Sequence, residues 1–288
     1  MTLSAMRQYL AVCFLLAINI QIVSSGELFQ IGTSANGQNI DCYSFGNGEK
    51  CIIVIGGIHG RYEENTILIA DRLITYCREY EDNLNVNIKI VKNLNPDSFR
   101  YELDDPLLKI NGSLIRFNGN AVDLNRNWDT PNWQKDCTYS FNDLRIGAGG
   151  KEPMSEPEIT GLSNLLINNK NNFQEIYVIV LHSYVVNKQK VNYVFPSFTV
   201  NNDQEIKVLE NADGLADLFS QNRNFTKLTV FQFYNVTGEL LNWCGINNIT
   251  AIDLEFCNDG NIDEVQSNQK SHWQNFIESF KYFLENIS

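Results

Sequence analysis

Three short, mostly apolar runs stand out in the hydrophobic pattern of the chain, at residues 51–55, 174–181 and 249–254. Continuous apolar runs of this length are typical of strands buried in a largely parallel sheet. Helical spacing and helix-start signals predict helices over residues 64–78, 155–166, 204–220, 240–244 and 263–287. Strands that alternate with helices predict an α/β fold, in which helices flank a mixed, largely parallel central sheet.

Local signals refine this picture. Additional strands are expected at 28–31, 40–44 and 86–91. The helix near 155 has Ser155 as its expected N-cap and Pro157 early in its first turn. Residues 98–150 are irregular and rich in Asn, Asp and Gly, and loops that long in a compact domain are usually functional.

Each of the three apolar runs leads into a residue that can take part in catalysis or bind a metal. His59 comes shortly after the first run, His182 directly after the second, and Glu255 directly after the third. In open α/β sheets, ligands bind in the crevice outside the carboxyl ends of the strands. Two imidazoles and nearby carboxylates at one rim suit a catalytic zinc with three protein ligands and a free base.

The first 25 residues have the pattern of a secretory signal peptide. Arg7 precedes an apolar stretch at 10–23, and small residues follow it, which predicts cleavage before Gly26. Residues 26–288 then form a single domain, and strand-like sequence begins so early that we expect no inhibitory pro-segment. The predicted location is extracellular, or the lumen of the secretory or lysosomal pathway, with no stable membrane association.

Six cysteines remain after position 25, and an even count in a secreted chain predicts disulfide bonds. Cys42 and Cys51 flank a Gly-Asn-Gly turn signal, so they are candidates to face each other across a hairpin. Glycosylation sequons occur at five asparagines, namely Asn111, Asn224, Asn235, Asn248 and Asn286. The net charge of −12 argues against nucleic acid as a partner and indicates a solvated acidic surface.

Several motifs appear in the order in which one enzyme family carries them. They are GGIHGRYE (56–63), NPD (95–97), RFNGNAVDLNRNW (116–128), SEPE (155–158), LHSY (181–184), YNVTGELLNW (234–243) and IDLEF (252–256). Through these motifs nearly the whole chain after position 25 resembles the zinc carboxypeptidases, the metallocarboxypeptidase or funnelin family. The resemblance implies that family's α/β/α sandwich and Zn²⁺ as the cofactor.

The resemblance also implies a metal site made by His59, Glu63 and His182. The family places its first two ligands in a His-x-x-Glu motif, whereas here Tyr62 occupies the third position after His59. We expect Glu63 to be the ligand, as in similar members that carry a turn longer by one residue, with Glu64 as the alternative.

The remaining roles follow from the same motifs. Glu255 matches the general base, and Arg116 matches the arginine that polarises the scissile carbonyl. Asn125 and Arg126 match the residues that hold the terminal carboxylate of the substrate, for which a guanidinium fork is suited. Tyr234 matches the tyrosine that closes over the terminal residue.

Two residues have a purely structural alternative. Leu241 occupies the position that selects the terminal side chain, where an apolar residue favours neutral termini, but a plain core role is equally expected. His272 has no matching role, and we predict an exposed, structural histidine.

The sequence therefore predicts a secreted zinc metallocarboxypeptidase, a monomer that acts on peptides with a free C-terminal carboxylate. Two alternatives stay open at this point. One is a zinc amidase that acts on cell-wall peptides or small N-acyl amino acids. The other is a catalytically inactive binding protein on the same fold, although the presence of His59, His182, Glu255, Arg116 and Arg126 argues against it.

Overall fold

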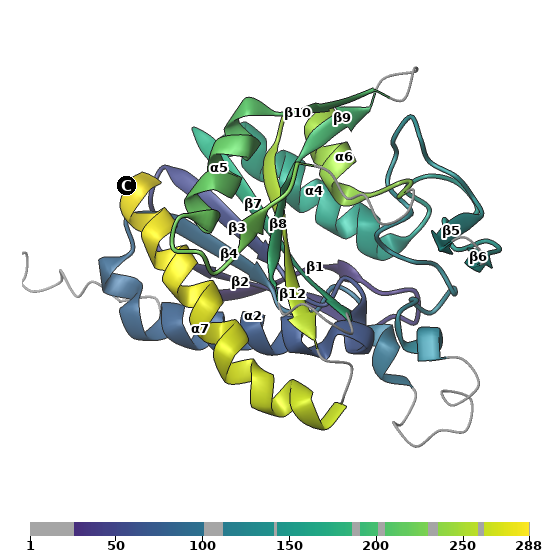
Figure 1. Cartoon of the computed structure of the whole chain (residues 1–288), viewed down its shortest axis with the longest axis horizontal. Coiled ribbons are helices and arrows are strands. Elements are labelled where there is room, and N and C mark those ends of the chain that lie inside the picture. Colours follow the sequence, from purple (N-terminus) through teal and green to yellow (C-terminus); the bar gives the residue numbers. More distant parts are fainter. Residues whose placement is uncertain are drawn as a thin grey trace, which may run out of the picture.

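A computed structural model gives the fold of the chain (Figure 1). It describes residues 26–100, 112–140, 143–185, 191–200, 205–229, 236–258 and 262–287. Within these residues, eight strands form one sheet: β1 (Glu27–Thr33), β2 (Asn39–Phe45), β3 (Lys50–Ile55), β4 (Asn87–Val91), β7 (Glu175–Val185), β8 (Tyr193–Pro196), β11 (Thr226–Lys227) and β12 (Thr250–Asn258).

The strand order is β1-β2-β4-β3-β7-β12-β8-β11. The four central strands β4, β3, β7 and β12 are parallel to one another. The pairs β1–β2, β2–β4 and β12–β8 are antiparallel, and the edge strand β11 is parallel to β8. The predicted mixed and largely parallel sheet is therefore confirmed. The three apolar runs form β3, β7 and β12, which are adjacent in the centre of the sheet because they can be buried on both faces.

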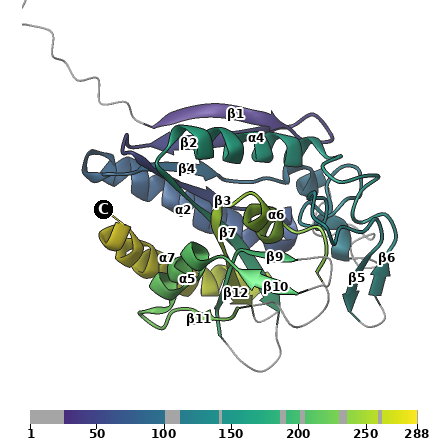
Figure 2. The ribbon, with the colours of Figure 1, turned by 90° about the horizontal axis from the view of Figure 1, so that it is seen from above.

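Helices cover both faces of the sheet (Figure 2). These helices are α2 (Glu64–Tyr80), α4 (Pro157–Asn172), α5 (Glu210–Ser220), α6 (Leu240–Ile246) and α7 (Ile262–Ile287). On one face α4 and α6 pack over a core that includes Leu162 and Leu240. On the other face α2, α5 and α7 enclose a second core around Leu73, Phe219 and Phe280.

Two small hairpins lie outside the sheet. Strands β9 (Phe198–Val200) and β10 (Ile206–Val208) form one, and β5 (Cys137–Ser140) and β6 (Asp143–Arg145) form the other. The second hairpin belongs to the long segment predicted to be irregular. Short 3-10 helices, η1 (Gly60–Glu63), η2 (Glu81–Asn83), η3 (Pro96–Arg100) and η4 (Gly112–Ile115), complete the described elements.

Three local predictions are wrong in detail. Helix α5 begins at Glu210 rather than 204, because Ile206–Val208 pair with β9 instead. The N-cap of α4 is Glu156, and the hydroxyl of Ser155 donates to the carboxylate of Glu156 rather than to the helix. His272 is only 4% exposed, and its Nε2 lies 2.9 Å from the carbonyl oxygen of Cys257.

The disulfide prediction is also wrong for the part of the chain that the structure describes. Cys42 lies on β2 and Cys51 on β3, but β4 lies between these strands, so the two residues do not face each other in a hairpin. No disulfide joins the cysteines of the described residues, and their side chains are buried. Burial raises the pKa of both Cys42 and Cys51 to about 12, which makes these thiols unreactive.

Some predictions fall outside the described residues. These are the signal peptide over 1–25, the sequons at Asn111 and Asn235, and the role of Tyr234. Among the residues that are described, none of the helices combines the length and the apolar character that crossing a bilayer requires.

Candidate metal centre and active site

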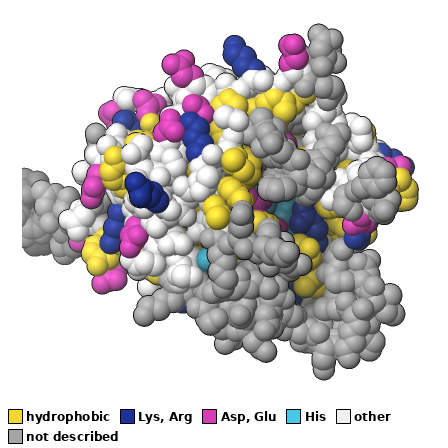
Figure 3. Space-filling view, viewed as in Figure 1, with side chains coloured by type: hydrophobic (Ala, Val, Ile, Leu, Met, Phe, Trp, Pro, Cys, Tyr) yellow, Lys and Arg dark blue, Asp and Glu magenta, His cyan; other side chains and the backbone are white. Residues whose placement is uncertain are grey.

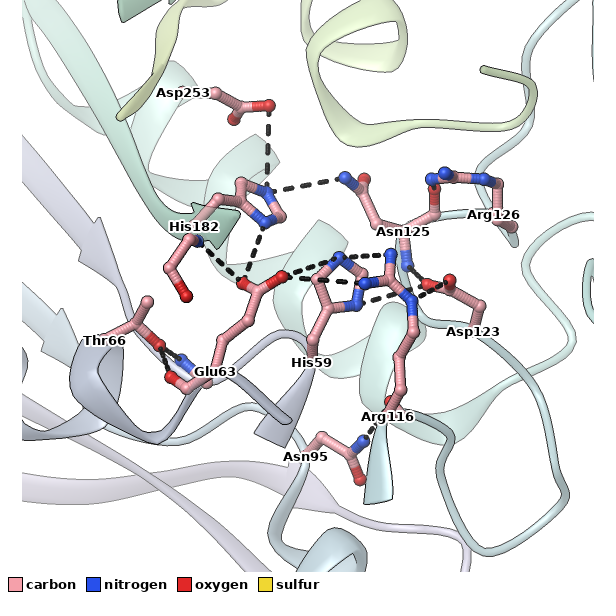
Figure 4. Close-up of polar contacts among 12 residues, drawn as sticks. His59, Glu63, Thr66, Asn95, Arg116, Asp123, Asn125, Arg126, His182 and Asp253 are labelled. Carbon is pink, nitrogen blue, oxygen red and sulfur yellow. Dashed lines mark hydrogen bonds and ion pairs between the residues drawn. The ribbon is translucent and has the colours of Figure 1, made fainter. Parts of the chain in front are cut away.

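His59, Glu63 and His182 converge at the carboxyl end of the central strands (Figure 4). His59 follows β3, Glu63 ends the η1 turn, and His182 lies near the end of β7. Each residue offers one ligand atom, and these atoms all lie within 4.8 Å of one another. All three side chains are almost fully buried, with exposed fractions between 2% and 4%.

The turn after β3 brings two of these residues together. Gly57 and Gly60 both adopt positive φ, at 63° and 54°. At Gly60, a Cβ atom would approach the hydroxyl oxygen of Ser98 to 2.1 Å, so only glycine fits. The η1 helix that follows places Glu63, rather than Tyr62, next to His59.

One hydrogen bond of His59, from Arg116, indicates a tautomer that can ligate a metal. Nη2 of Arg116 donates to Nε2 of His59 at 2.8 Å, and a guanidinium can only donate, so Nε2 carries the lone pair. The proton is then on Nδ1, which lies 3.4 Å from Oδ1 of Asp123. A carboxylate behind the imidazole is the usual second partner of a metal-binding histidine. The donor set therefore fits zinc.

The surroundings of the two adjacent acids favour Glu63 over Glu64 as the ligand. Oε2 of Glu63 accepts from the backbone N–H of Ser183 at 3.2 Å and lies 3.3 Å from Nδ1 of His182. The side chain of Glu64 is 41% exposed and pairs with Arg61 instead.

The pairing of β7 with β12 places further acids beside His182. Glu255 is directly opposite His182 in the parallel register. Because side chains alternate along a strand, Asp253 and Glu255 point to the same face of the sheet. Oδ2 of Asp253 lies 3.7 Å from Nε2 of His182, and Oε2 of Glu255 is buried and makes no hydrogen bond within the described residues.

Two titratable groups at this edge of the sheet, Glu255 and His182, have shifted pKa values. Burial raises the pKa of Glu255 to about 7, although the charges of His182, Arg116 and Arg126 oppose this effect. For His182, burial alone would lower the pKa, but the carboxylates of Asp253 and Glu63 outweigh it and raise the pKa to about 10. A free carboxylate with a pKa near neutrality is a suitable general base.

Two arginines form the cationic side of the site. Arg116 donates from Nε to Oδ2 of Asp123 at 2.8 Å. Arg126 is 2% exposed and donates from Nη1 to the backbone carbonyl of Asn125 at 2.7 Å. Nδ2 of Asn125 lies 3.4 Å from Nε2 of His182, so the NRN segment directly borders the candidate metal centre.

Tyr139 on β5 links this cationic side to the candidate metal centre. Its hydroxyl donates to Oδ2 of Asp123. Its ring lies 5.4 Å from the guanidinium carbon of Arg116 and 5.1 Å from that of Arg126. The side chain therefore touches both arginines and the carboxylate that supports His59.

In the space-filling view, histidine and cationic side chains lie side by side at the bottom of a hollow (Figure 3). Most of the predicted site residues thus lie together, namely His59, Glu63, Arg116, Asn125, Arg126, His182 and Glu255. Leu241 differs, because it is 2% exposed within the core around α6.

Sequence reasoning missed three residues of this region, namely Asp123, Tyr139 and Asp253. For two of them a signal was present. Asp253 interrupts an apolar strand two residues before Glu255, so alternation alone puts both acids on one face. Asp123 lies two residues before Asn125 in the motif that carries the resemblance.

A buried His-Glu-His set with a nearby free carboxylate, at the rim of a mixed α/β sheet, defines the class of metal-dependent hydrolases. The family comparison is more specific. Residues 14–284 match the model of the zinc carboxypeptidase family, so the chain belongs to that family, whose members use zinc. A comparison with curated proteins found no match.

Solved structures with the same fold include three kinds of protein. Thrombin-activatable fibrinolysis inhibitor is 16% identical, with a TM-score of 0.66 over 91% of this chain and 69% of its own. Carboxypeptidase A from Helicoverpa armigera is 14% identical, with a TM-score of 0.62 over 90% and 69% of the two chains. Murein-tripeptide amidase MpaA from Escherichia coli O157 is 19% identical, with a TM-score of 0.54 over 89% and 91%.

Proposed function

We propose that the protein is a secreted zinc metallocarboxypeptidase that removes the C-terminal residue of peptides. The observation that carries the proposal is the position of Arg126, a buried guanidinium beside Asn125, which itself contacts His182. A buried arginine that borders a metal site offers a charge-assisted, bidentate contact to a carboxylate. The C-terminus of a peptide supplies this carboxylate next to the bond to be cleaved.

His59, Glu63 and His182 would hold the zinc ion. When bound, zinc polarises a carbonyl and lowers the pKa of the attacking water. Arg126 and Asn125 hold the terminal carboxylate, which places the scissile amide beside the three ligands. We expect Tyr234 to close over the terminal residue, as the family resemblance implies.

Glu255 carries out the proton transfers. Its Oε2, which is buried and has no hydrogen-bond partner among the described residues, accepts a proton from the water that attacks the carbonyl carbon. Arg116 donates to the carbonyl oxygen as that oxygen gains negative charge. Glu255 then passes the proton to the leaving nitrogen as the carbon–nitrogen bond breaks, so that water is added across the amide.

A second candidate function is an amidase that cleaves cell-wall peptides. The match to murein-tripeptide amidase favours it, because that chain is covered to 91% and is thus of similar length. Both candidates use the same metal set and base, and they differ in the substrate that the hollow accepts.

The test compares a blocked dipeptide with a free C-terminus, its amidated counterpart and a cell-wall tripeptide. A carboxypeptidase cleaves the free acid far faster than the amide, because the amide leaves Arg126 without its anionic partner. Equal rates on the two dipeptides would remove the carboxypeptidase proposal, and cleavage of the tripeptide alone would establish the amidase. Glu255→Gln should keep zinc but lose at least about two orders of magnitude in turnover.

A further inference from the structure

An exposed tyrosine beside the candidate metal centre has no role in the function proposed above. Tyr62 lies on the η1 turn between His59 and Glu63, and it directly precedes Glu63. The two proposed ligands are 2% and 4% exposed, whereas Tyr62 is 47% exposed. Single exposed aromatic side chains are common on protein surfaces, so the position of Tyr62, rather than its exposure, is the informative observation.

The ring of Tyr62 belongs to a row of four side chains in contact with one another. The guanidinium carbon of Arg116 lies 5.5 Å from the centre of the Tyr62 ring and 5.4 Å from that of the Tyr139 ring. Tyr139 in turn lies 5.1 Å from the guanidinium carbon of Arg126. The order of contacts is therefore Arg126, Tyr139, Arg116 and Tyr62.

This row leads from the buried part of the site to its rim. Arg126 is 2% exposed, the side chain of Arg116 is 12% exposed, and Tyr62 is 47% exposed. The proposed function places the terminal carboxylate at Arg126 and the scissile carbonyl at Arg116. A peptide bound in this direction continues outward from Arg116, so the residue before the scissile bond comes next to Tyr62.

We propose that Tyr62 is the contact surface for the side chain of the residue that precedes the scissile bond, and that it selects an aromatic side chain there. The inference rests on the proposed function, because the direction of the peptide depends on Arg126 and Arg116. Tyr62 has no part in the bond cleavage itself, so its effect is on the choice of substrate.

The physical reason is the burial of one aromatic surface by another. Arg116 lies over the Tyr62 ring, while nearly half of the residue stays open to water. An aromatic side chain that packs on this open part removes apolar area of both partners from water, and it adds the favourable contact of two rings. Alanine at the same position of the peptide leaves the ring exposed, and leucine covers it without the contact between rings.

The experiment measures kcat/KM on acetylated dipeptides with a free C-terminus and one constant terminal residue. The first residue is phenylalanine, leucine or alanine. The wild-type enzyme should prefer phenylalanine over alanine by about tenfold, with leucine in between. Tyr62→Ala should bring this ratio close to one, whereas Tyr62→Phe should keep it, because the ring and not the hydroxyl makes the contact. Tyr282→Ala, at an exposed tyrosine of α7, is the matched control and should keep the ratio.

The ratio separates selection of the substrate from support of Arg116. It compares two substrates on one preparation, so a loss of zinc or of folded protein does not change it. If Tyr62 only holds Arg116 in place, then Tyr62→Ala slows all three dipeptides by the same factor, the ratio stays constant, and the proposal is overturned. Equal wild-type rates on the phenylalanine and alanine dipeptides overturn it as well.

A second series tests the direction of the peptide. Its dipeptides keep phenylalanine as the first residue and differ only in the terminal residue. Tyr62→Ala should leave the preference for the terminal residue as it is in the wild type. If that preference changes and the preference for the first residue does not, then Tyr62 contacts the other side of the scissile bond, and the proposal is wrong.

If no dipeptide is cleaved, the proposed function fails, but the contact can still be tested by binding. Calorimetry with the uncleaved dipeptides should then show tighter binding of the phenylalanine form than of the alanine form. Tyr62→Ala should remove the difference. Equal or undetectable binding of the two dipeptides by the wild type would overturn the inference.

Discussion

Replacement of Tyr139 tests whether one side chain of the β5–β6 hairpin supports the whole cationic side of the site. Tyr139→Phe removes only the hydroxyl that donates to the buried carboxylate of Asp123. Tyr139→Leu also removes the ring that contacts Arg116 and Arg126 at 5.4 Å and 5.1 Å. The two variants therefore separate the hydrogen bond from the aromatic contacts.

The structure sets the size of the expected effects. A hydrogen bond to a charged group contributes about 1.5–3 kcal/mol. Asp123 keeps the Nε of Arg116 at 2.8 Å and the backbone N–H of Asn125 at 2.9 Å, so we expect the lower end, about 1.5 kcal/mol, for Tyr139→Phe. Each cation–π contact at a partly exposed ring adds about 0.5–1 kcal/mol, which gives a total of about 3 kcal/mol for Tyr139→Leu.

Urea unfolding of the zinc-free protein measures these losses, and Tyr282→Phe, at an exposed tyrosine of α7, is the matched control. Steady-state kinetics adds a second measurement. Loss of the ring should raise KM for the free acid more than it lowers kcat, because Arg126 loses its support. If both Tyr139 variants unfold like the wild type, then Tyr139 does not support the site. If both are destabilised by the same amount, then the hydroxyl supports the site and the ring contacts contribute nothing.

Three further predictions concern the metal and the thiols. Glu63→Gln should lose most of its zinc, measured by metal analysis, whereas Glu64→Gln should keep it; the reverse result would make Glu64 the ligand. Zinc binding to the metal-free protein should become weaker as the pH falls below the pKa of His182, which is about 10, because the ligand nitrogen must lose its proton. We expect the affinity to fall about tenfold for each pH unit, and a pH-independent affinity by calorimetry would contradict this. A thiol reagent should modify almost no cysteine in the native, unreduced protein that comprises residues 26–288. After denaturation without reduction it should modify all six cysteines, and a count below six would indicate disulfide bonds.

Hydrophobic pattern alone predicted the centre of the fold. Strands β3, β7 and β12 are mostly apolar on both faces for much of their length, so they appear in the sequence as nearly continuous apolar runs. The edges were harder to predict. The hairpins β5–β6 and β9–β10 pair outside the main sheet, and their strands of three or four residues are too short to show a periodic pattern.

The candidate site divides in the same way. Residues that follow an apolar run, such as His182, could be placed because the parallel sheet brings strand ends to one rim. Tyr139 could not be placed, since its contacts with Asp123 and Arg126 depend on the path of a long loop. The disulfide prediction failed for a different reason. An even count is also compatible with buried thiols, and only the order β2-β4-β3 shows that Cys42 and Cys51 lie on strands that do not pair.

The register between β7 and β12 explains why two acids lie beside the same histidine. On β12 the residues that face α2 and α7 are Ile252, Leu254 and Phe256, which form ordinary core. The alternate residues Asp253 and Glu255 face the metal side, although a purely structural strand would carry apolar residues there as well. Two carboxylates on one short strand repel each other and cost stability, and such a cost is typical of functional sites. Because the two residues are only two positions apart, a strand that positions the proposed base opposite His182 also positions Asp253 beside the same imidazole.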